Sequence, residues 1–405
     1  MALTIDKITY YLLLLFSFLL PISRASDTIF TIYFSLFFFI YILFNYKKCL
    51  LLKDKFFHII MAFIAYILIS ILWSSNQKLG ATTHYIQWFA IFGLAIYISK
   101  HIQIVDKLLT FFLAGMVISE ILSYGIYFGL WSINGKDSTD PTPFMMHIDY
   151  SIYIAFAALI LLNRLFSNRY TIKEKIFMAI FFVTMSGNLF INGGRTGQLA
   201  FILALIVSFF IHFRFNVKNL ITVLMGAFLL IGIAFYSSEN FQIKTYQAID
   251  DIKLMQKNNY NSSWGLRLYM WKIGSSLVKE NPILGSGINS QKDLTKKYLQ
   301  DNHPKNLSNW SIDVIKNNHL HSQYIQTIVE LGIIGIAFLI VIFYQIFKFK
   351  IIKDEFRELK YIFITIFLVG FLPEPLFLKQ FTNILFIFFI SILYALDIYN
   401  KRRVC

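Results

Sequence analysis

The chain of 405 residues contains only two cysteines, Cys49 and Cys405, which lie far apart in the sequence. A disulfide framework and a cysteine-based metal site are therefore excluded, and Cys405 lacks the three following residues that prenylation requires. Charged residues are also scarce, at 15% compared with about 25% in soluble domains, whereas 57% of residues are hydrophobic and 18% aromatic. There is no internal repeat, low-complexity tract or soluble domain, so the composition indicates a membrane protein.

The net charge of +15 does not indicate nucleic-acid binding. That function needs a basic face on a soluble domain, whereas the lysines and arginines here occur in short clusters between apolar stretches. Such a distribution is typical of membrane topology, so we expect the lipid bilayer, and not nucleic acid, to be a partner of this chain.

Long apolar stretches dominate the chain, and crossing ~30 Å of hydrocarbon requires about 20 apolar residues in a helix. We therefore predict an all-α, polytopic membrane protein with about 12 transmembrane helices. Nine of these lie in 1–237 and three in 319–405, which ends in a cytoplasmic tail, while 238–318 forms one large periplasmic loop domain that carries short helices. The predicted spans are 8–22, 28–45, 56–73, 82–99, 108–131, 148–163, 176–191, 197–213, 219–237, 322–347, 361–378 and 381–398.

The charges of the loops set the orientation of these spans. With a cytoplasmic N-terminus, the inside segments hold 21 lysines and arginines and the short outside loops hold five. The other 11 lie in the long loop, and long loops are largely exempt from the positive-inside rule. Both termini are therefore expected in the cytoplasm. Alternatively, the stretch after Lys7 is a signal peptide with a weak cleavage site at 23–25. Its cleavage would leave the other spans oriented as before.

The tight outer turn at 192–197 reads Asn-Gly-Gly-Arg-Thr-Gly and separates the seventh and eighth spans. Its glycines permit a sharp re-entry, and the N-terminus of the helix that follows favours anions through its free N–H groups and its dipole. Arg195, next to Thr196, adds a planar and permanently charged fork that suits phosphate. An arginine that only anchors the helix end is the alternative, but its place against the positive-inside trend favours function.

Within the long loop, a helix is predicted from Trp264 to Glu280, because an Asn-Pro pair follows. Its aromatic and aliphatic residues recur at helical spacing, so the helix is expected to lie on the membrane interface with these side chains toward the lipid. Arg267 and Lys272 then lie near the head groups, where simple anchoring is a reasonable alternative for Lys272. The residues at helical spacing are Trp264, Leu268 and Trp271.

His319 and His321 lie two residues apart, where the long loop gives way to the tenth span. Residues two apart in a regular helix point in different directions, so the two are not expected to face one site. One of them is expected in the loop or at the helix cap, and capping or interface anchoring is an alternative to catalysis. A metal site is not expected, because no third and fourth ligands are evident at suitable spacing.

Other polar residues near the outer boundary are secondary candidates. His147, Asp149 and Glu374 belong to this group, and Glu120 lies inside the fifth span. An intramembrane carboxylate is a functional candidate by default, although it can equally be protonated or hydrogen-bonded to a neighbouring helix.

Three short motifs follow one another between about 190 and 335, and in this order and on this side of the membrane they resemble the O-antigen ligase and O-antigen polymerase superfamily of bacterial membrane glycosyltransferases. The likeness is greatest to O-antigen ligase, and Ser322 stands where asparagine is common. The motifs are Arg195-Thr196-Gly197; Arg267 and Trp271 with NPILGSG at 281–287; and His321-Ser322-Gln323-Tyr324-Ile325-Gln326 followed by Glu330-Leu331-Gly332 and Gly335.

The resemblance implies transfer of a glycan from undecaprenyl pyrophosphate to an acceptor hydroxyl at the periplasmic face of the bacterial inner membrane, without a metal ion or other cofactor. In ligases the acceptor is a sugar of the lipid A–core. Arg195 and Arg267 would stabilise the leaving pyrophosphate, and His321 would be the general base of a single, inverting displacement. The residues expected to bind substrate or support the site are His319, Thr196, Tyr324, Trp271, Lys272, His147 and Asp149.

Two alternatives lie within the same superfamily, a polymerase that joins repeat units on the lipid carrier and an oligosaccharyltransferase that acts on protein. The shared donor half does not separate them, although twelve spans with one dominant outer loop favour the ligase. A transporter or flippase is less favoured, because such proteins carry substrate groups near mid-membrane, often with an internal repeat. Here Glu120 is the only acidic or basic residue deep in a span.

Overall fold

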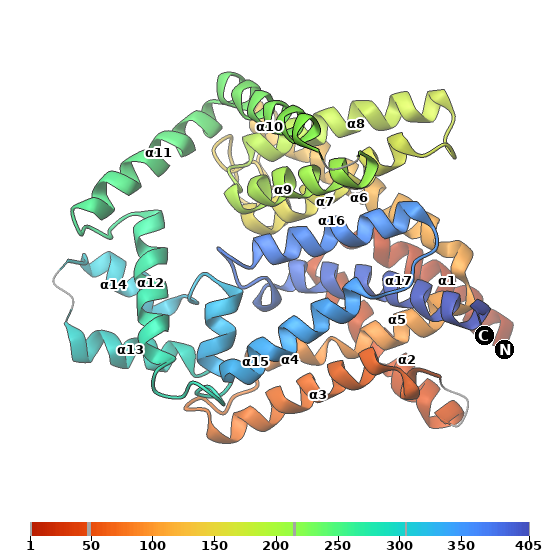
Figure 1. Ribbon diagram of the computed structural model, residues 1–405, viewed down its shortest axis with the longest axis horizontal. Helices are drawn as coiled ribbons and strands as arrows, with labels where there is room; N and C mark the ends of the chain where they lie inside the picture. Colours follow the sequence, from red (N-terminus) through yellow and green to blue (C-terminus); the bar gives the residue numbers. More distant parts are fainter. Residues whose placement is uncertain (1, 47–49, 214–215, 304–305, 405) are drawn as a thin grey trace.

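The computed structural model describes residues 2–46, 50–213, 216–303 and 306–404 (Figure 1). Over these residues the chain contains helices and no strand, so the all-α prediction is confirmed for them. Cys49 and Cys405 lie outside the described residues, and what the sequence predicts for them stays a prediction.

Every predicted span contains a helix. Short 3₁₀ turns lie between some of the helices: η2 (Leu50–Lys53), η3 (Ile71–Trp73), η4 (Ile102–Ile104) and η5 (Leu376–Leu378). The helices are α1 (Ala2–Leu19), α2 (Arg24–Asn45), α3 (Lys55–Ser70), α4 (Thr82–Ile86), α5 (Phe89–Lys100), α6 (Val105–Tyr127), α7 (His147–Phe166), α8 (Ile172–Ile191), α9 (Arg195–His212), α10 (Val217–Ser237), α15 (Gln323–Phe347), α16 (Asp354–Gly370) and α17 (Gln380–Val404).

The predicted number of 12 spans is not confirmed, because nine helices of the described part are long and apolar enough to cross a membrane. The predicted span at 82–99 is divided into α4 and α5 at Gln87 and Trp88. The first two turns of α16 are strongly charged, and α1 includes Asp6 and Lys7. Nine such helices in the described part are typical of a multi-pass membrane protein.

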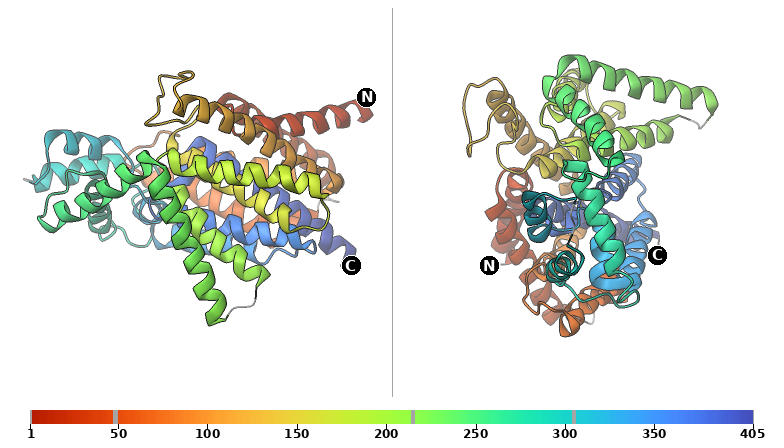
Figure 2. Two further views of the ribbon diagram at one scale, coloured as in Figure 1. Left: turned by 90° about the horizontal axis from the view of Figure 1, so that it is seen from above. Right: turned by 90° about the vertical axis from the view of Figure 1, so that its left-hand side faces the viewer.

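Packing in the bundle is very uneven. The apolar windows of α7 and α17 are almost entirely buried, and these two helices form the centre, where α7 contacts α8, α9 and α16, and α17 contacts α5. In contrast, α10 is almost entirely exposed and crosses the outside of the bundle obliquely (Figure 2). Its long apolar surface is therefore left for lipid.

The segment 238–318 contains four helices that project from one end of the bundle, while the start of α1 and the end of α17 lie at the opposite end (Figure 1). A small hydrophobic core of its own includes Leu266, Met270 and Ile273. These three residues belong to α12, and they form a different face of that helix from the predicted stripe of Trp264, Leu268 and Trp271. Helix α12 therefore packs on the small core through its aliphatic face and not through that stripe. The four helices are α11 (Glu239–Gln256), α12 (Ser263–Leu277), α13 (Gln291–Asn302) and α14 (Asn309–Asn317).

The NPILGSG motif at 281–287 packs against the motif that runs from Glu330 to Gly335, and we call this contact the joint. Helix α15 is kinked at Gly332, where φ is +62°, a conformation that favours glycine. The NPILGSG loop fills the kink, because the Ser286 N–H donates to the Val329 carbonyl at 3.0 Å. A Cβ at Gly332 would lie 2.1 Å from the Ile283 carbonyl oxygen, so only glycine fits. The joint fixes the start of α15 relative to α12, and this is where the histidines lie.

Candidate active site

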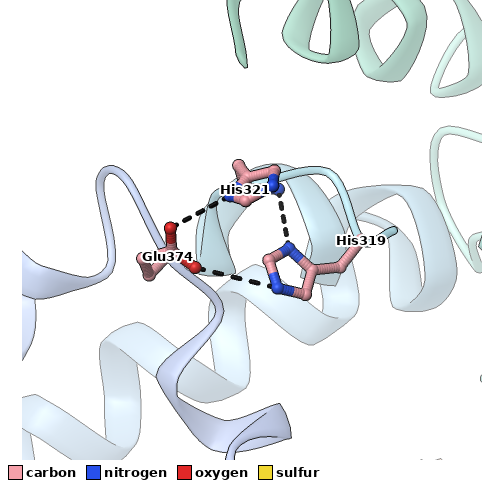
Figure 3. Close-up of side chains that lie close together, drawn as sticks. All are labelled: His319, His321 and Glu374. Atoms are coloured by element: carbon pink, nitrogen blue, oxygen red, sulfur yellow. Dashed lines mark hydrogen bonds and ion pairs between the residues drawn. The ribbon is translucent and has the colours of Figure 1, made fainter. Parts of the chain in front are cut away.

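Glu374 is the centre of a polar cluster in the loop between α16 and α17, and its side chain is completely buried. Its Oε1 accepts a hydrogen bond from Nη2 of Arg267 at 3.0 Å and lies 3.0 Å from Nδ1 of His321. Its Oε2 lies 3.7 Å from Nε2 of His319 and 3.9 Å from Nζ of Lys379. Four side chains that can carry positive charge therefore converge on one carboxylate, and the two histidines among them are drawn in Figure 3.

His319 and His321 both face Glu374, so the prediction that they would not share a site is wrong (Figure 3). The prediction assumed a regular helix, but α15 begins only at Gln323 and both histidines precede it. His321 has φ of +47°, and the two ring centroids are 4.4 Å apart. The His321 N–H donates to Nδ1 of His319 at 3.2 Å, and the Trp271 indole N–H donates to the His321 carbonyl at 3.1 Å. These bonds hold a backbone conformation that is uncommon outside glycine.

The hydrogen bond to Glu374 assigns roles to the ring nitrogens of His321. Because a carboxylate only accepts, Nδ1 must carry the donated proton in this network. In the neutral ring Nε2 is then an acceptor, and it has no hydrogen bond to any residue in the described part of the chain. This arrangement leaves Nε2 able to accept a proton, and the carboxylate lies where it would stabilise the positive charge of a protonated ring.

Burial and hydrogen bonding set the charges in this cluster. Burial alone raises the pKa of Glu374, but the hydrogen bond with His321 and the charge of Lys379 lower it to about 2. Burial also lowers the pKa of His319 to about 3. Near neutral pH, Glu374 is therefore ionised and His319 is uncharged. The negative charge is balanced by Arg267 and Lys379.

Arg195 is the first residue of α9, as the turn motif predicts. The turn brings α9 so close to α7 that a Cβ on Gly197 would lie 2.3 Å from the Ser151 carbonyl oxygen. The guanidinium donates from Nη2 to the Lys244 carbonyl at 2.9 Å, whereas its buried Nη1 has no hydrogen-bond partner among the described residues. No carboxylate of the described chain forms an ion pair with Arg195, so part of its charge is available to a bound anion.

Arg195 and Arg267, from two distant motifs, line the same cavity of about 370 Å³, which we call the arginine cavity. Lys244 of α11 adds a third cation, and the Arg267 guanidinium lies 5.6 Å from the ring of Trp264, within cation–π range. Three cations around one cavity favour an anionic ligand. The other lining residues are Thr139, Asp140, His147, Ile148, Asn192, Gly193, Thr196, Leu199, Gln247, Ser263 and Pro373.

The structure brings some of the predicted substrate-binding residues to cavities. Thr196 and His147 line the arginine cavity. Asp149 is buried, its Oδ1 lacks a hydrogen-bond partner in the described part, and it lines a separate cavity of about 390 Å³ together with Lys379.

The other predicted substrate-binding residues have different surroundings. His319 contacts Glu374, and Trp271 holds the backbone of the neighbouring histidine. Lys272 is exposed, and the Tyr324 hydroxyl donates to the Leu368 carbonyl at 2.8 Å. None of these four residues lines the arginine cavity, so their contact with substrate stays a prediction. Glu120, the intramembrane candidate, does not line it either.

The trio His319, His321 and Glu374 offers three ligand atoms within 4.8 Å of one another, a spacing that suits a metal ion. The sequence did not indicate this trio, because its third member lies far along the chain. Arg267 and Lys379 already contact the same carboxylate, and a divalent cation would be repelled by both. The donor set therefore fits a carboxylate–histidine pair better than it fits a metal site.

Sequence reasoning placed Glu374 only among secondary candidates and did not identify Lys244. A signal for Glu374 existed, since this carboxylate lies between two prolines at the outer end of a predicted span. Nothing in the sequence singled out Lys244, because it belongs to no motif and reaches the cavity only through the packing of α11 against α8 and α12.

Residues 180–340 match the family model described as O-antigen ligase, a segment that includes both arginines and both histidines but not Glu374. The resemblance to the O-antigen ligase and polymerase superfamily is therefore confirmed for residues 180–340, which are less than half of the chain. A Haemophilus influenzae protein, named only as uncharacterized, is 30% identical over 218 residues, which is 52% of this chain and 52% of that protein. The chain thus spans about half the length of the curated relative it matches.

Proposed function

Because residues 180–340 match the O-antigen ligase family model, we propose that this protein transfers a glycan from undecaprenyl pyrophosphate to a sugar hydroxyl of the lipid A–core. The observation that carries the proposal is the position of Glu374. Its carboxylate holds Arg267 and His321, each at 3.0 Å. A cation for the leaving group and a base for the nucleophile are thus fixed by one buried anion.

The arginine cavity is the proposed site of the pyrophosphate. Arg195, Arg267 and Lys244 line it, and the unpaired Nη1 of Arg195 is a donor aimed at no protein group in the described chain. Negative charge grows on the pyrophosphate as its bond to the sugar breaks, and fixed cations stabilise that charge. The guanidinium groups take the place of a divalent ion, so the reaction is proposed to be metal-independent.

The reaction is a single displacement with His321 as the base. The acceptor oxygen forms a bond to the anomeric carbon while the bond from that carbon to the pyrophosphate oxygen breaks. The bonding electrons leave with the pyrophosphate, and the hydroxyl proton passes to Nε2 of His321. Attack opposite the leaving group inverts the anomeric centre. Glu374 then stabilises the protonated ring, and His319 supports the backbone of the base.

The site is proposed to face the periplasm from the bacterial inner membrane. Two observations support this side: the cluster includes Arg267 of α12, one of the helices that project from one end of the bundle, and the start of α1 and the end of α17 lie at the other end (Figure 1). The positive-inside rule assigns that other end to the cytoplasm.

A polymerase of the same superfamily is the alternative, and gene deletion followed by electrophoresis of lipopolysaccharide separates the two. A ligase deletion leaves lipid A–core without polymer while long lipid-linked polymer accumulates. A polymerase deletion leaves single repeat units. Restoration by wild-type protein, but not by Arg195→Ala, Arg267→Ala or His321→Ala protein that inserts normally, assigns the chemistry to this site. Full restoration by all three variants would refute the proposal. A glycan missing from protein instead would indicate an oligosaccharyltransferase.

A further inference from the structure

A second cavity, of about 260 Å³, lies between α12 and α14 and shares Arg267 and Ser263 with the arginine cavity. We call it the Trp310 cavity, and we propose that it binds the sugar ring that carries the accepting hydroxyl, with Trp310 as the platform for that ring. This inference rests on the proposed transferase function. The remaining lining residues are Asn261, Ser262, Leu266, Met270, Val314 and His321.

The chemistry of the Trp310 cavity differs from that of the arginine cavity. Arg267 is the only arginine or lysine that lines it, whereas two arginines and a lysine line the arginine cavity. The other lining groups are an amide, two hydroxyls, an indole, an imidazole, a thioether and aliphatic side chains. Such a mixture suits a neutral ligand with an apolar face and polar edges, which describes a sugar ring. The volume lies below the ~300 Å³ at which pockets for drug-sized ligands begin, so one ring fits better than a lipid.

Trp310 has the properties of a binding platform. Its side chain is 65% exposed, and its indole N–H donates to no residue in the described part of the chain. A tryptophan offers a large apolar surface and one polar donor, and it normally finds a partner for both when it is buried. An acceptor sugar would supply that partner, stacking on the ring and accepting from the N–H.

The wall that carries Trp310 is held in place before any ligand binds. The Asn261 Oδ1 accepts from the Ser308 N–H at 2.7 Å and from the Ser311 hydroxyl at 2.7 Å. Ser308 also caps the N-terminus of α14, where its hydroxyl accepts from the Ser311 N–H at 3.1 Å. Trp310 lies within this capped turn, so little ordering is needed when the cavity fills.

The Trp310 cavity also has the right neighbours for an acceptor. His321 lines it, and because Nδ1 is bound to Glu374, Nε2 is the nitrogen left to take a proton. Arg267 lines both cavities, so a donor held by its pyrophosphate in one would present its anomeric carbon next to the other. A hydroxyl in the Trp310 cavity would then reach the base and the anomeric carbon together.

Steady-state kinetics of the full-length protein in nanodiscs test the inference. The donor is an undecaprenyl-pyrophosphate-linked glycan, and each substrate is varied while the other is saturating. The acceptor probe is lipid A–core without polymer. For polymerase activity it is a methyl glycoside of the repeat unit, which can act only as an acceptor. We expect Trp310→Ala to raise the acceptor KM about 5- to 20-fold with the donor KM unchanged, and Trp310→Phe to stay within about threefold of wild type. Tyr246→Ala, at an exposed aromatic residue outside both cavities, is the control and should match wild type.

Each other outcome overturns the inference in a recognisable way. A rise in the donor KM would place the donor glycan in the cavity. Equal KM values for Trp310→Ala and wild type would show that no sugar contacts the indole. A fall in thermal stability with both KM values unchanged would make Trp310 a structural or membrane anchor. Absence of transfer by wild type with either acceptor would refute the proposed function itself, whereas the other outcomes leave it intact.

Discussion

Replacement of Glu374 by glutamine preserves the size of the side chain and removes the negative charge on which Arg267 and His321 converge. Both donors contact the same oxygen, Oε1, at 3.0 Å. A glutamine amide oxygen can still accept from both, but two hydrogen bonds to an anion become two hydrogen bonds to a neutral group. The amide NH₂ would also replace Oε2, which now faces Lys379 at 3.9 Å.

The size of the effect follows from these contacts. A hydrogen bond to a charged group contributes about 1.5–3 kcal/mol and a neutral one about 0.5–1.5 kcal/mol, so each bond loses about 1–1.5 kcal/mol. In the proposed mechanism, His321 becomes charged only when it takes the proton, and Arg267 acts on the leaving group as its negative charge grows. If the loss of ~2–3 kcal/mol falls on the transition state, the turnover rate drops about 30- to 150-fold.

The assay is the initial rate of glycan transfer by full-length protein in nanodiscs, with an undecaprenyl-pyrophosphate-linked donor and lipid A–core. Glu280→Gln makes the same chemical change at an exposed glutamate and serves as the control. In a His321→Ala background, Glu374→Gln should have a much smaller effect, because part of its action passes through the base. If folded Glu374→Gln protein keeps its rate within about threefold of wild type, the carboxylate has no part in the chemistry.

Three further predictions concern Arg195, Trp271 and His319. Arg195→Ala should lower the rate about 10²- to 10³-fold, because a fixed donor to the leaving anion is lost, whereas Arg357→Ala, at an exposed arginine of α16, should not change it. Trp271→Phe removes the hydrogen bond to the carbonyl of the general base, worth about 0.5–1.5 kcal/mol, and should lower kcat about 2- to 12-fold with KM unchanged. His319 has a pKa lowered from 6.5 to about 3, so between these values the unfolded chain binds a proton that the folded protein does not. Acidification therefore favours unfolding, and the apparent Tm should fall from about pH 7.5 to about pH 5.5 more in wild type than in His319→Gln.

Each of these has a contrary outcome. An Arg195→Ala rate equal to that of the Arg357→Ala control would mean that the arginine only anchors α9. A Trp271→Phe effect confined to KM would make the indole a substrate contact and not a support for the base. Equal shifts of Tm with pH in wild type and His319→Gln would show that His319 is not held neutral by burial.

The positions of the bundle helices followed from the sequence because apolar length alone makes a helix necessary in a bilayer. The break between α4 and α5 did not follow, since the surrounding residues are apolar. At the break, the Trp88 indole N–H donates to Asn383 of α17, far away in the sequence, at 2.9 Å. That side-chain contact, and not a local breaker such as proline, accompanies the division of the predicted span.

The positions of the motif residues could be predicted from local sequence, whereas their long-range contacts could not. The position of Arg195 at the start of α9 follows from local sequence. The partnership of Glu374 with His321 joins residues 53 positions apart, and no spacing rule reaches that far. The two histidines were not expected to face one site because the prediction used regular helical geometry and placed one of them in the loop or at the cap, whereas both precede α15.

Release of undecaprenyl pyrophosphate coupled to a new glycosidic bond tests the central claim most directly. Purified protein given the lipid-linked glycan and lipid A–core, with EDTA present, should release one undecaprenyl pyrophosphate for each glycan that appears on lipid A–core. His321→Ala should stop both events, and His303→Ala, at an exposed histidine, should stop neither. Equal release by wild type and His321→Ala, or loss of activity in EDTA that a divalent ion restores, would contradict a metal-independent transferase with His321 as its base.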